Sequence, residues 1–255
     1  MERRTFFPGW LLPALLVTPQ LALTIVFFLW PAGQAIWTSA TRSDPFGIHT
    51  SFVGLENFVD LFTDPLYVAS IGRSAFFCAA VAAISLSAAM TFAVAADREI
   101  RFRGLYRVML IWPYAIAPAV AAVLWILVLH PNIGLVGRWL NSVGIHWDYK
   151  LNDYQAMFVV VLASAWKEIS YNFIFLLAGL QSISRSVTEA ARMDGAKGFF
   201  RFRTVTLPLL MPTVFFLLVV NLVYGAFDTF GTIWAMTSGG PGKATETLVV
   251  KVYRD

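Results

Sequence analysis

The sequence predicts an all-α, polytopic bundle of membrane-spanning helices, and composition, apolar runs and loop charge are the observations that predict it. Hydrophobic residues make up 58% of the 255 residues and charged residues only 13%, against roughly 45–50% and about 25% in soluble globular proteins. So little polar material cannot cover a water-facing surface, and we therefore expect lipid to be the outer solvent.

Charge-free runs in the sequence are long enough to cross a bilayer, which needs about 20 apolar residues in a helix. These runs are Thr5–Thr41, Ser74–Ala96, Val108–Leu129 and Thr204–Phe227. Tyr154–Ser184 is a further candidate, interrupted only by Lys167 and Glu168. We treat residues 1–255 as one transmembrane domain. Its predicted spans lie near 15–38, 74–96, 108–129, 156–180 and 205–227, and a last span is predicted to start at 246–255.

Prolines modify two of the predicted spans, because proline lacks a backbone N–H and bends or breaks a helix. The first apolar run contains Pro13, Pro19 and Pro31, so we expect helix only in its later part. Pro113 and Pro118 lie in the third span and predict a bend there.

Loop charges predict the orientation of the chain, since short loops rich in Lys and Arg stay in the cytoplasm. Loop 97–107 carries four arginines and loop 181–206 carries five basic residues, whereas 39–73 and 132–153 carry two each. With Arg3 and Arg4 at the start, the N-terminus is predicted to be cytoplasmic. The net charge of +4 then reflects loop placement, and we expect no nucleic-acid partner.

Polar residues in the fourth predicted span suggest a function. Lys167 and Glu168 fall near its middle, where an ionisable group costs about 2.5–3.5 kcal/mol on insertion scales. At helical spacing Ser164, Glu168 and Asn172 share one face, and Lys167 and Tyr171 share an adjoining face. One interpretation is a polar stripe along a solute path. A charge pair held by another helix or subunit, or a span shifted toward the interface, stays equally open.

The fifth span ends with Asn221, Tyr224 and Asp228 on one face. Tyr224 and Asp228 could equally be interfacial anchors. The candidate solute path therefore comprises Lys167, Glu168, Tyr171, Asn172, Asn221 and Tyr224. An anionic solute would favour a cation in this path, and Lys167 is the one basic residue predicted to lie deep in a span.

The loop at 181–204 predicts a short helix on the cytoplasmic face. Ser186 and Glu189 have the spacing of a capping box, and Gly195 suits the left-handed residue that ends a helix. The resulting helix of about eight residues would be roughly 12 Å long, too short to span a membrane. A docking element is one interpretation, and a helix lying in the headgroup zone is the other.

The same loop resembles the signature loop of binding-protein-dependent ABC importer permeases. The matching pattern is Glu189, Ala190, Ala191, Asp194, Gly195, Ala196, Phe202, Val205, Leu207, Pro208, Leu209 and Pro212. The resemblance implies that 181–204 is the coupling loop that docks onto an ATPase subunit, with Glu189 and Gly195 the positions most sensitive to mutation.

A second motif, Thr237–Pro241 (TSGGP), resembles the TxGGP element of carbohydrate-type importer permeases. Residues 30–33, 43–47, 117–125, 166–173 and 219–230 are similar to the A-type permease of sn-glycerol-3-phosphate importers. The resemblance implies a type I ABC importer permease in a bacterial-type inner membrane, importing that solute or a related sugar or polyol phosphate. Its implied partners are a second homologous permease, two ATPase subunits and an extracytoplasmic solute-binding protein. Another carbohydrate such as maltose remains an alternative, as does an ion-coupled carrier.

The resembling family has six core spans, whereas this sequence stops where the sixth would begin. We therefore expect either a truncated sequence or an absent last helix with an external C-terminus. We do not expect an enzyme. The stretch 239–245 (GGPGKAT) lacks the first Gly and the final Ser or Thr of a phosphate-binding loop, so ATP is expected on a partner subunit and no cofactor on this chain. Cys78 is the single cysteine, and the three histidines lack metal-ligand spacing.

Overall fold

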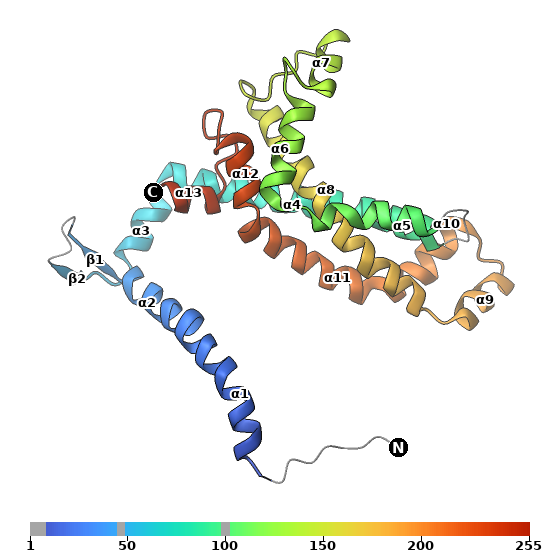
Figure 1. Cartoon of the computed structure of the whole chain (residues 1–255), viewed down its shortest axis with the longest axis horizontal. Coiled ribbons are helices and arrows are strands. Elements are labelled where there is room, and N and C mark those ends of the chain that lie inside the picture. Colours follow the sequence, from blue (N-terminus) through green and yellow to red (C-terminus); the bar gives the residue numbers. More distant parts are fainter. Residues whose placement is uncertain (1–8, 45–48, 98–102) are drawn as a thin grey trace. The chain divides into compact units, whose positions relative to one another are not determined.

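The computed structural model describes residues 9–44, 49–97 and 103–255, and helices dominate it (Figure 1). By their internal contacts, residues 1–68 and 69–255 form two compact units, and each is described by itself below. Some basic residues behind the predicted orientation, namely Arg3, Arg4, Arg98 and Arg101, lie outside the described residues.

The first unit begins with one apolar helical stretch of 29 residues, Leu11–Ser39. It consists of α1 (Leu11–Thr24), a π-helical turn (Ile25–Leu29) and α2 (Trp30–Ser39). The prediction that only the later part of this run is helical was wrong. Pro13 lies in the first turn, where a backbone N–H has no helical partner, and Pro31 lies in the first turn of α2, directly after the π-helical turn.

A small hairpin and a short helix complete the first unit. Strand β1 (Thr41–Ser43) pairs antiparallel with β2 (Thr50–Phe52), with Thr41 opposite Phe52. Helix α3 (Glu56–Thr63) follows. Arg42 of β1 forms an ion pair with Asp60 of α3, and the side-chain amide of Asn57 donates to the carbonyl of Thr41 at 2.9 Å. These contacts fix the hairpin to α3.

The second unit is built on three long helical stretches. These are α4 (Pro65–Asp97), α8 (Asp153–Ser182) and residues 198–228. In the third stretch, a π-helical turn at Phe202–Thr206 joins α10 (Gly198–Arg201) to α11 (Leu207–Val223), and a second π-helical turn at Tyr224–Asp228 follows α11. The core between them pairs small side chains with large ones: Ala89 and Ala93 of α4 pack in one buried cluster with Phe173 of α8 and Leu217 of α11. Small residues let helix backbones approach closely, which is what helix association in lipid requires.

The third predicted span, 108–129, is not one continuous helix. Helix α5 (Arg103–Ile111) runs into a 3₁₀ turn (Trp112–Ala115), and α6 (Pro118–Leu129) leaves it at an angle of 107°. The break has a local cause. Pro118 is the first residue of α6, and Ala117 before it has an extended ψ of 140°, as a following proline requires. The predicted bend is confirmed, but it is a break.

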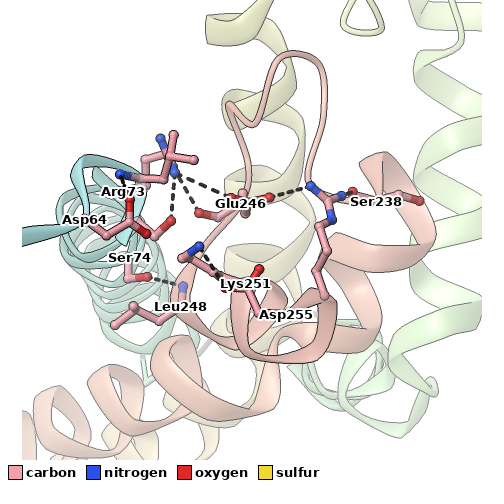
Figure 2. Close-up of polar contacts among 11 residues, drawn as sticks. Asp64, Arg73, Ser74, Ser238, Glu246, Leu248, Lys251 and Asp255 are labelled. Atoms are coloured by element: carbon pink, nitrogen blue, oxygen red, sulfur yellow. Dashed lines mark hydrogen bonds and ion pairs between the residues drawn. The ribbon is translucent and has the colours of Figure 1, made fainter. Parts of the chain in front are cut away.

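Four shorter helices lie between or after these stretches: α7 (Leu135–Ser142), α9 (Arg185–Met193), α12 (Phe230–Thr237) and α13 (Leu248–Arg254). Figure 2 shows how the loop after α12 is held. Buried Glu246 pairs with Arg254, and its backbone carbonyl accepts from Nε of Arg73 at 3.0 Å. Ser74 accepts the backbone N–H of Leu248 at 2.7 Å. The TSGGP loop and α13 are therefore anchored to the beginning of α4.

Candidate solute cavity and coupling helix

A cavity of about 540 Å³ opens where the broken third span meets the polar parts of α8 and α11. The lining residues come from the 3₁₀ turn, the start of α6, the middle of α8, the end of α11 and the π-helical turn after it. They are Tyr114, Pro118, Lys167, Glu168, Tyr171, Val219, Val220, Val223, Tyr224 and Asp228.

Four predicted path residues meet on the wall of this cavity: Lys167, Glu168, Tyr171 and Tyr224. Asp228, which shares a helix face with Tyr224, joins them. Sequence reasoning missed the wall formed by Tyr114 and Pro118, although it predicted a bend from Pro113 and Pro118. A bend alone does not say which side chains a break of 107° turns toward α8 and α11.

The charged groups of the cavity have few protein partners. Glu168 is only 6% exposed, yet neither it nor Lys167 has a hydrogen bond or ion pair with another described residue. The hydroxyl of Tyr224 is also buried without a protein hydrogen-bond partner. Most buried polar side-chain atoms in proteins are hydrogen-bonded, so this wall presents free donor and acceptor capacity to whatever enters the cavity.

Aromatic rings extend from the cavity along α8. The ring centroids of Tyr114 and Tyr171 are 5.8 Å apart, and those of Tyr171 and Phe175 are 4.8 Å apart. Ring faces of this kind suit the C–H surface of a small polar solute. Within the described ranges, no group of three His, Cys, Asp or Glu side chains is placed to hold a metal ion.

The other two predicted path residues, Asn172 and Asn221, do not line the cavity. Both are fully buried, and their side-chain amides pair reciprocally at 3.0 and 2.8 Å. Ser85 of α4 donates to the amide oxygen of Asn221 at 2.7 Å and accepts from Asn172 at 3.1 Å. The remaining amide hydrogen of Asn221 goes to the carbonyl of Leu217 at 2.7 Å. We call Ser85, Asn172 and Asn221 the amide cluster, and it joins α4, α8 and α11.

A smaller cavity of about 280 Å³ lies beside the TSGGP loop, lined by Tyr149, Lys150 and part of that loop. Tyr149 is 1% exposed. Burial, with a smaller contribution from neighbouring Asp148, raises the pKa of the Tyr149 hydroxyl above its ordinary value. The hydroxyl therefore stays neutral at physiological pH.

The predicted coupling helix forms as α9, with one correction at its start. The capping box at Ser186 and Glu189 was wrong: the helix begins at Arg185, Ser184 is the N-cap residue, and no side chain caps it. The Oγ atoms of Ser184 and Ser186 lie 2.7 Å apart instead. Because the start of the helix shifts by two residues, Glu189 no longer stands at the capping position.

The end of α9 is a Schellman motif. The N–H of Ala196 donates to the carbonyl of Ala191 at 2.9 Å, and the N–H of Gly195 donates to that of Arg192 at 3.1 Å. Gly195 has φ +84°, a conformation that glycine adopts without strain. The prediction of a left-handed Gly195 is therefore confirmed.

The predicted coupling residues differ in exposure. Ala191 and Ala196 are buried, whereas Glu189, Ala190, Asp194 and Gly195 are exposed. The remaining coupling residues, Leu207 and Pro208, begin α11. Helix α9 lies against the π-helical turn at Phe202–Thr206 that leads into α11. The exposed end of α9 is thus connected to the same helical stretch, 198–228, that carries one wall of the cavity.

Apolar helices, a polar cavity among them and a short helix with a fixed end are the features of a membrane permease. The chain belongs to the binding-protein-dependent transport system inner membrane components, since the model of that family matches residues 83–250. It is a multi-pass inner-membrane permease subunit of an ABC importer.

Two relatives show how similar the chain is within that family. The sn-glycerol-3-phosphate transport system permease protein UgpA of Rhizobium meliloti (strain 1021) is 51% identical over 99% of this chain and 86% of its own length. The protein of the same name from Yersinia enterocolitica serotype O:8 is 53% identical over 100% of this chain and 86% of its own length.

The fold is also similar to that of a solved transporter. The crystal structure of a bacterial ABC transporter involved in the import of the acidic polysaccharide alginate superimposes with a TM-score of 0.80, covering 96% of this chain and 83% of that chain. Its sequence identity is 23%, so the likeness supports the fold alone. The type I importer permease fold expected from the signature loop is confirmed.

Proposed function

We propose that the chain forms half of the translocation pathway for sn-glycerol 3-phosphate or a related sugar or polyol phosphate. A second, homologous permease subunit supplies the other half. Relatives named for this solute are 51% and 53% identical over nearly the whole chain, which is the strongest support for the substrate. The cavity of about 540 Å³ has ample room for a three-carbon phosphate ester.

Helix α9 is the proposed docking element for a cytosolic ATPase subunit, and the paired permease subunit docks a second one. The observation that carries this proposal is the geometry of α9: its end is fixed by the Schellman motif while Glu189 and Asp194 remain exposed. ATP is bound and hydrolysed on the ATPase subunits, so this chain needs no cofactor of its own.

The outward side of the pathway receives solute from an extracytoplasmic solute-binding protein. The family description names binding-protein dependence, and an alginate ABC transporter of similar fold has been solved with its solute-bound periplasmic protein. Together with the distribution of basic loops, this supports our proposal that the N-terminus is cytoplasmic and the TSGGP loop lies outside.

Transport follows from the connection between α9 and the cavity. Closure of the ATPase subunits on ATP displaces α9, and α9 lies against the π-helical turn that begins the stretch 198–228. That stretch carries Val219, Val220 and Tyr224 into the cavity wall. Movement of α9 therefore moves the wall, turning the permease pair from inward-facing to outward-facing, and hydrolysis resets it.

The test is uptake by the complete importer in proteoliposomes: both permeases, the ATPase and the binding protein. We expect ATP-dependent uptake of labelled sn-glycerol 3-phosphate and much less uptake of labelled maltose. Preferred uptake of maltose would show that the substrate is another carbohydrate. Uptake driven by an ion gradient without the ATPase subunits would show that the protein is an ion-coupled carrier.

Coupling is tested separately with Glu189→Ala on the exposed face of α9. We expect normal membrane insertion and at least about a tenfold loss of uptake per ATP hydrolysed, because α9 would no longer hold the ATPase productively. Glu56→Ala on exposed α3, outside the proposed docking element, is the matched control. Full uptake in the Glu189→Ala importer would show that Glu189 does not take part in docking the ATPase subunit.

A further inference from the structure

The charge of the cavity does not suit the charge of the proposed solute. The lining residues contribute one positive side chain, Lys167, and two negative ones, Glu168 and Asp228. The sequence predicted both Lys167 and Glu168 in the solute path, with Lys167 as a cation for an anionic solute. The structure adds Asp228 to the same cavity, so its lining contains more carboxylates than cations.

Glu168 is the most constrained of these groups. It is 6% exposed, lines the cavity and has no hydrogen bond or ion pair among the described residues. An ionised carboxylate can only accept hydrogen bonds, through two oxygens, and burial without partners is costly for it. Its natural ligands are therefore donors, and the hydroxyl groups of a polyol are donors of the right size.

A phosphate group has the opposite requirements. It carries between one and two negative charges, and its oxygens accept their strongest hydrogen bonds from ionised side chains such as Lys and Arg. In a cavity of low polarity, charge interactions are much stronger than in water. Lys167 offsets one carboxylate at most, so a phosphate next to this wall would face net repulsion.

We propose that Glu168 binds the hydroxyl end of the solute, and that the phosphate is held outside the part of the pathway that this chain lines. The buried hydroxyl of Tyr224 and the ring of Tyr171 complete the site. This inference rests on the proposed function, because it assigns one end of the proposed substrate to this subunit. Glu168 is then the residue of this chain that recognises the hydroxyl groups of the solute.

The test compares two solutes in the complete importer: sn-glycerol 3-phosphate and 3-hydroxypropyl phosphate, which lacks only the 2-hydroxyl. A third solute, 2-hydroxypropyl phosphate, lacks only the 1-hydroxyl. Uptake is measured at concentrations that saturate the binding protein with each solute, so that differences arise after delivery. The quantity of interest is the ratio of uptake rates for the full and the deoxy solute.

We expect Glu168→Leu to reduce that ratio about tenfold or more for at least one deoxy solute, the usual effect of losing a hydrogen bond to a charged group. Glu168→Gln keeps an acceptor oxygen and should retain part of the ratio, which also guards against misfolding of the leucine variant. Glu56→Leu on exposed α3 is the matched control and should leave the ratio unchanged.

Two outcomes overturn different claims. If the wild-type importer takes up no sn-glycerol 3-phosphate, the proposed function fails, and this inference fails with it. If the wild type does take it up, but both Glu168 variants keep both ratios within twofold of wild type, the inference alone fails. A rise in uptake of all three phosphate esters in Glu168→Gln would show that the phosphate itself lies beside Glu168.

Discussion

Helices α8 and α11 carry two polar regions within one helical turn of each other, and the two are opposite in character. In the amide cluster, both hydrogens of each Asn side chain are donated, and Ser85 is bonded to both amides. In the cavity, no described residue hydrogen-bonds to Glu168, and the hydroxyl of Tyr224 is buried without a partner among those residues.

The difference separates two uses of polar residues in a membrane protein. Within lipid-facing helices, polar side chains that satisfy one another hold the helices together. Polar side chains that stay unsatisfied in a cavity mark a path for a solute or ion. Position in the sequence alone does not separate them, since Tyr171 and Asn172 are neighbours yet belong to different regions. The comparison makes predictions about stability and transport that can fail independently.

The largest expected effect is on the amide cluster. Asn172→Leu should destabilise the subunit by about 2–3 kcal/mol, because one buried amide hydrogen of Asn221 loses its acceptor and both Asn221 and Ser85 lose the donor that Asn172 supplies. The thermal unfolding of the purified complex checks this, and uptake should fall only in proportion to the folded fraction.

A triple-mutant cycle sharpens that prediction. Replacing every partner, with Asn172→Leu, Asn221→Leu and Ser85→Ala together, should recover much of the stability, since fully apolar replacements leave no unsatisfied group. If the triple variant is as unstable as the sum of its single changes, the cluster does not act as one hydrogen-bonded unit.

The next largest effect is expected in the cavity, where a substitution should stabilise the subunit instead of destabilising it. Glu168→Gln should raise the stability of the subunit by about 1 kcal/mol, because it removes the charge of a buried carboxylate that no described residue hydrogen-bonds, which outweighs the lost attraction to Lys167. Uptake should fall at the same time. A thermal melt and an uptake assay on the same preparation check both. If the melting temperature falls together with uptake, Glu168 stabilises the fold and is not a solute-binding residue.

The smallest effect is expected for Tyr224→Phe. Its buried hydroxyl has no protein partner, so its removal should change stability by less than about 0.5 kcal/mol. Uptake should fall about threefold or more, since the solute loses one hydrogen-bonding group. Tyr253→Phe, on an exposed ring of α13, is the matched control. Equal uptake by both variants would remove Tyr224 from the site.

Much of this architecture could be predicted from the sequence, and the failures have physical causes. Charge-free runs identify long helices, because only apolar residues can face lipid. The pattern from Glu189 to Pro212 predicted a coupling loop, whose role stays a proposal, and the left-handed Gly195 at the end of its helix was predicted correctly. Lys167 and Glu168 indicated the cavity, because an ionisable residue within a span is costly unless it faces a partner or a wet cavity.

The remaining features depend on contacts that helical spacing does not encode. Asn172 shares a face with Glu168 by sequence, but its partners Ser85 and Asn221 come from other helices. Pro118 predicted a bend, but the 107° break that brings Tyr114 to the cavity follows from the extended residues before it. The hairpin of β1 and β2 was missed because three-residue strands carry too little periodicity to be recognised.

The most direct test of the account asks whether the solute enters the cavity. In a Cys78→Ala background, Val223→Cys places a thiol on the cavity wall, and Leu217→Cys places one on the same helix in the packed core. With the complete importer turning over, we expect a water-soluble thiol reagent to modify Val223→Cys and saturating sn-glycerol 3-phosphate to slow that reaction at least threefold, while Leu217→Cys stays unreactive. Modification of Val223→Cys at the same rate with and without solute would contradict the assignment of this cavity as the path.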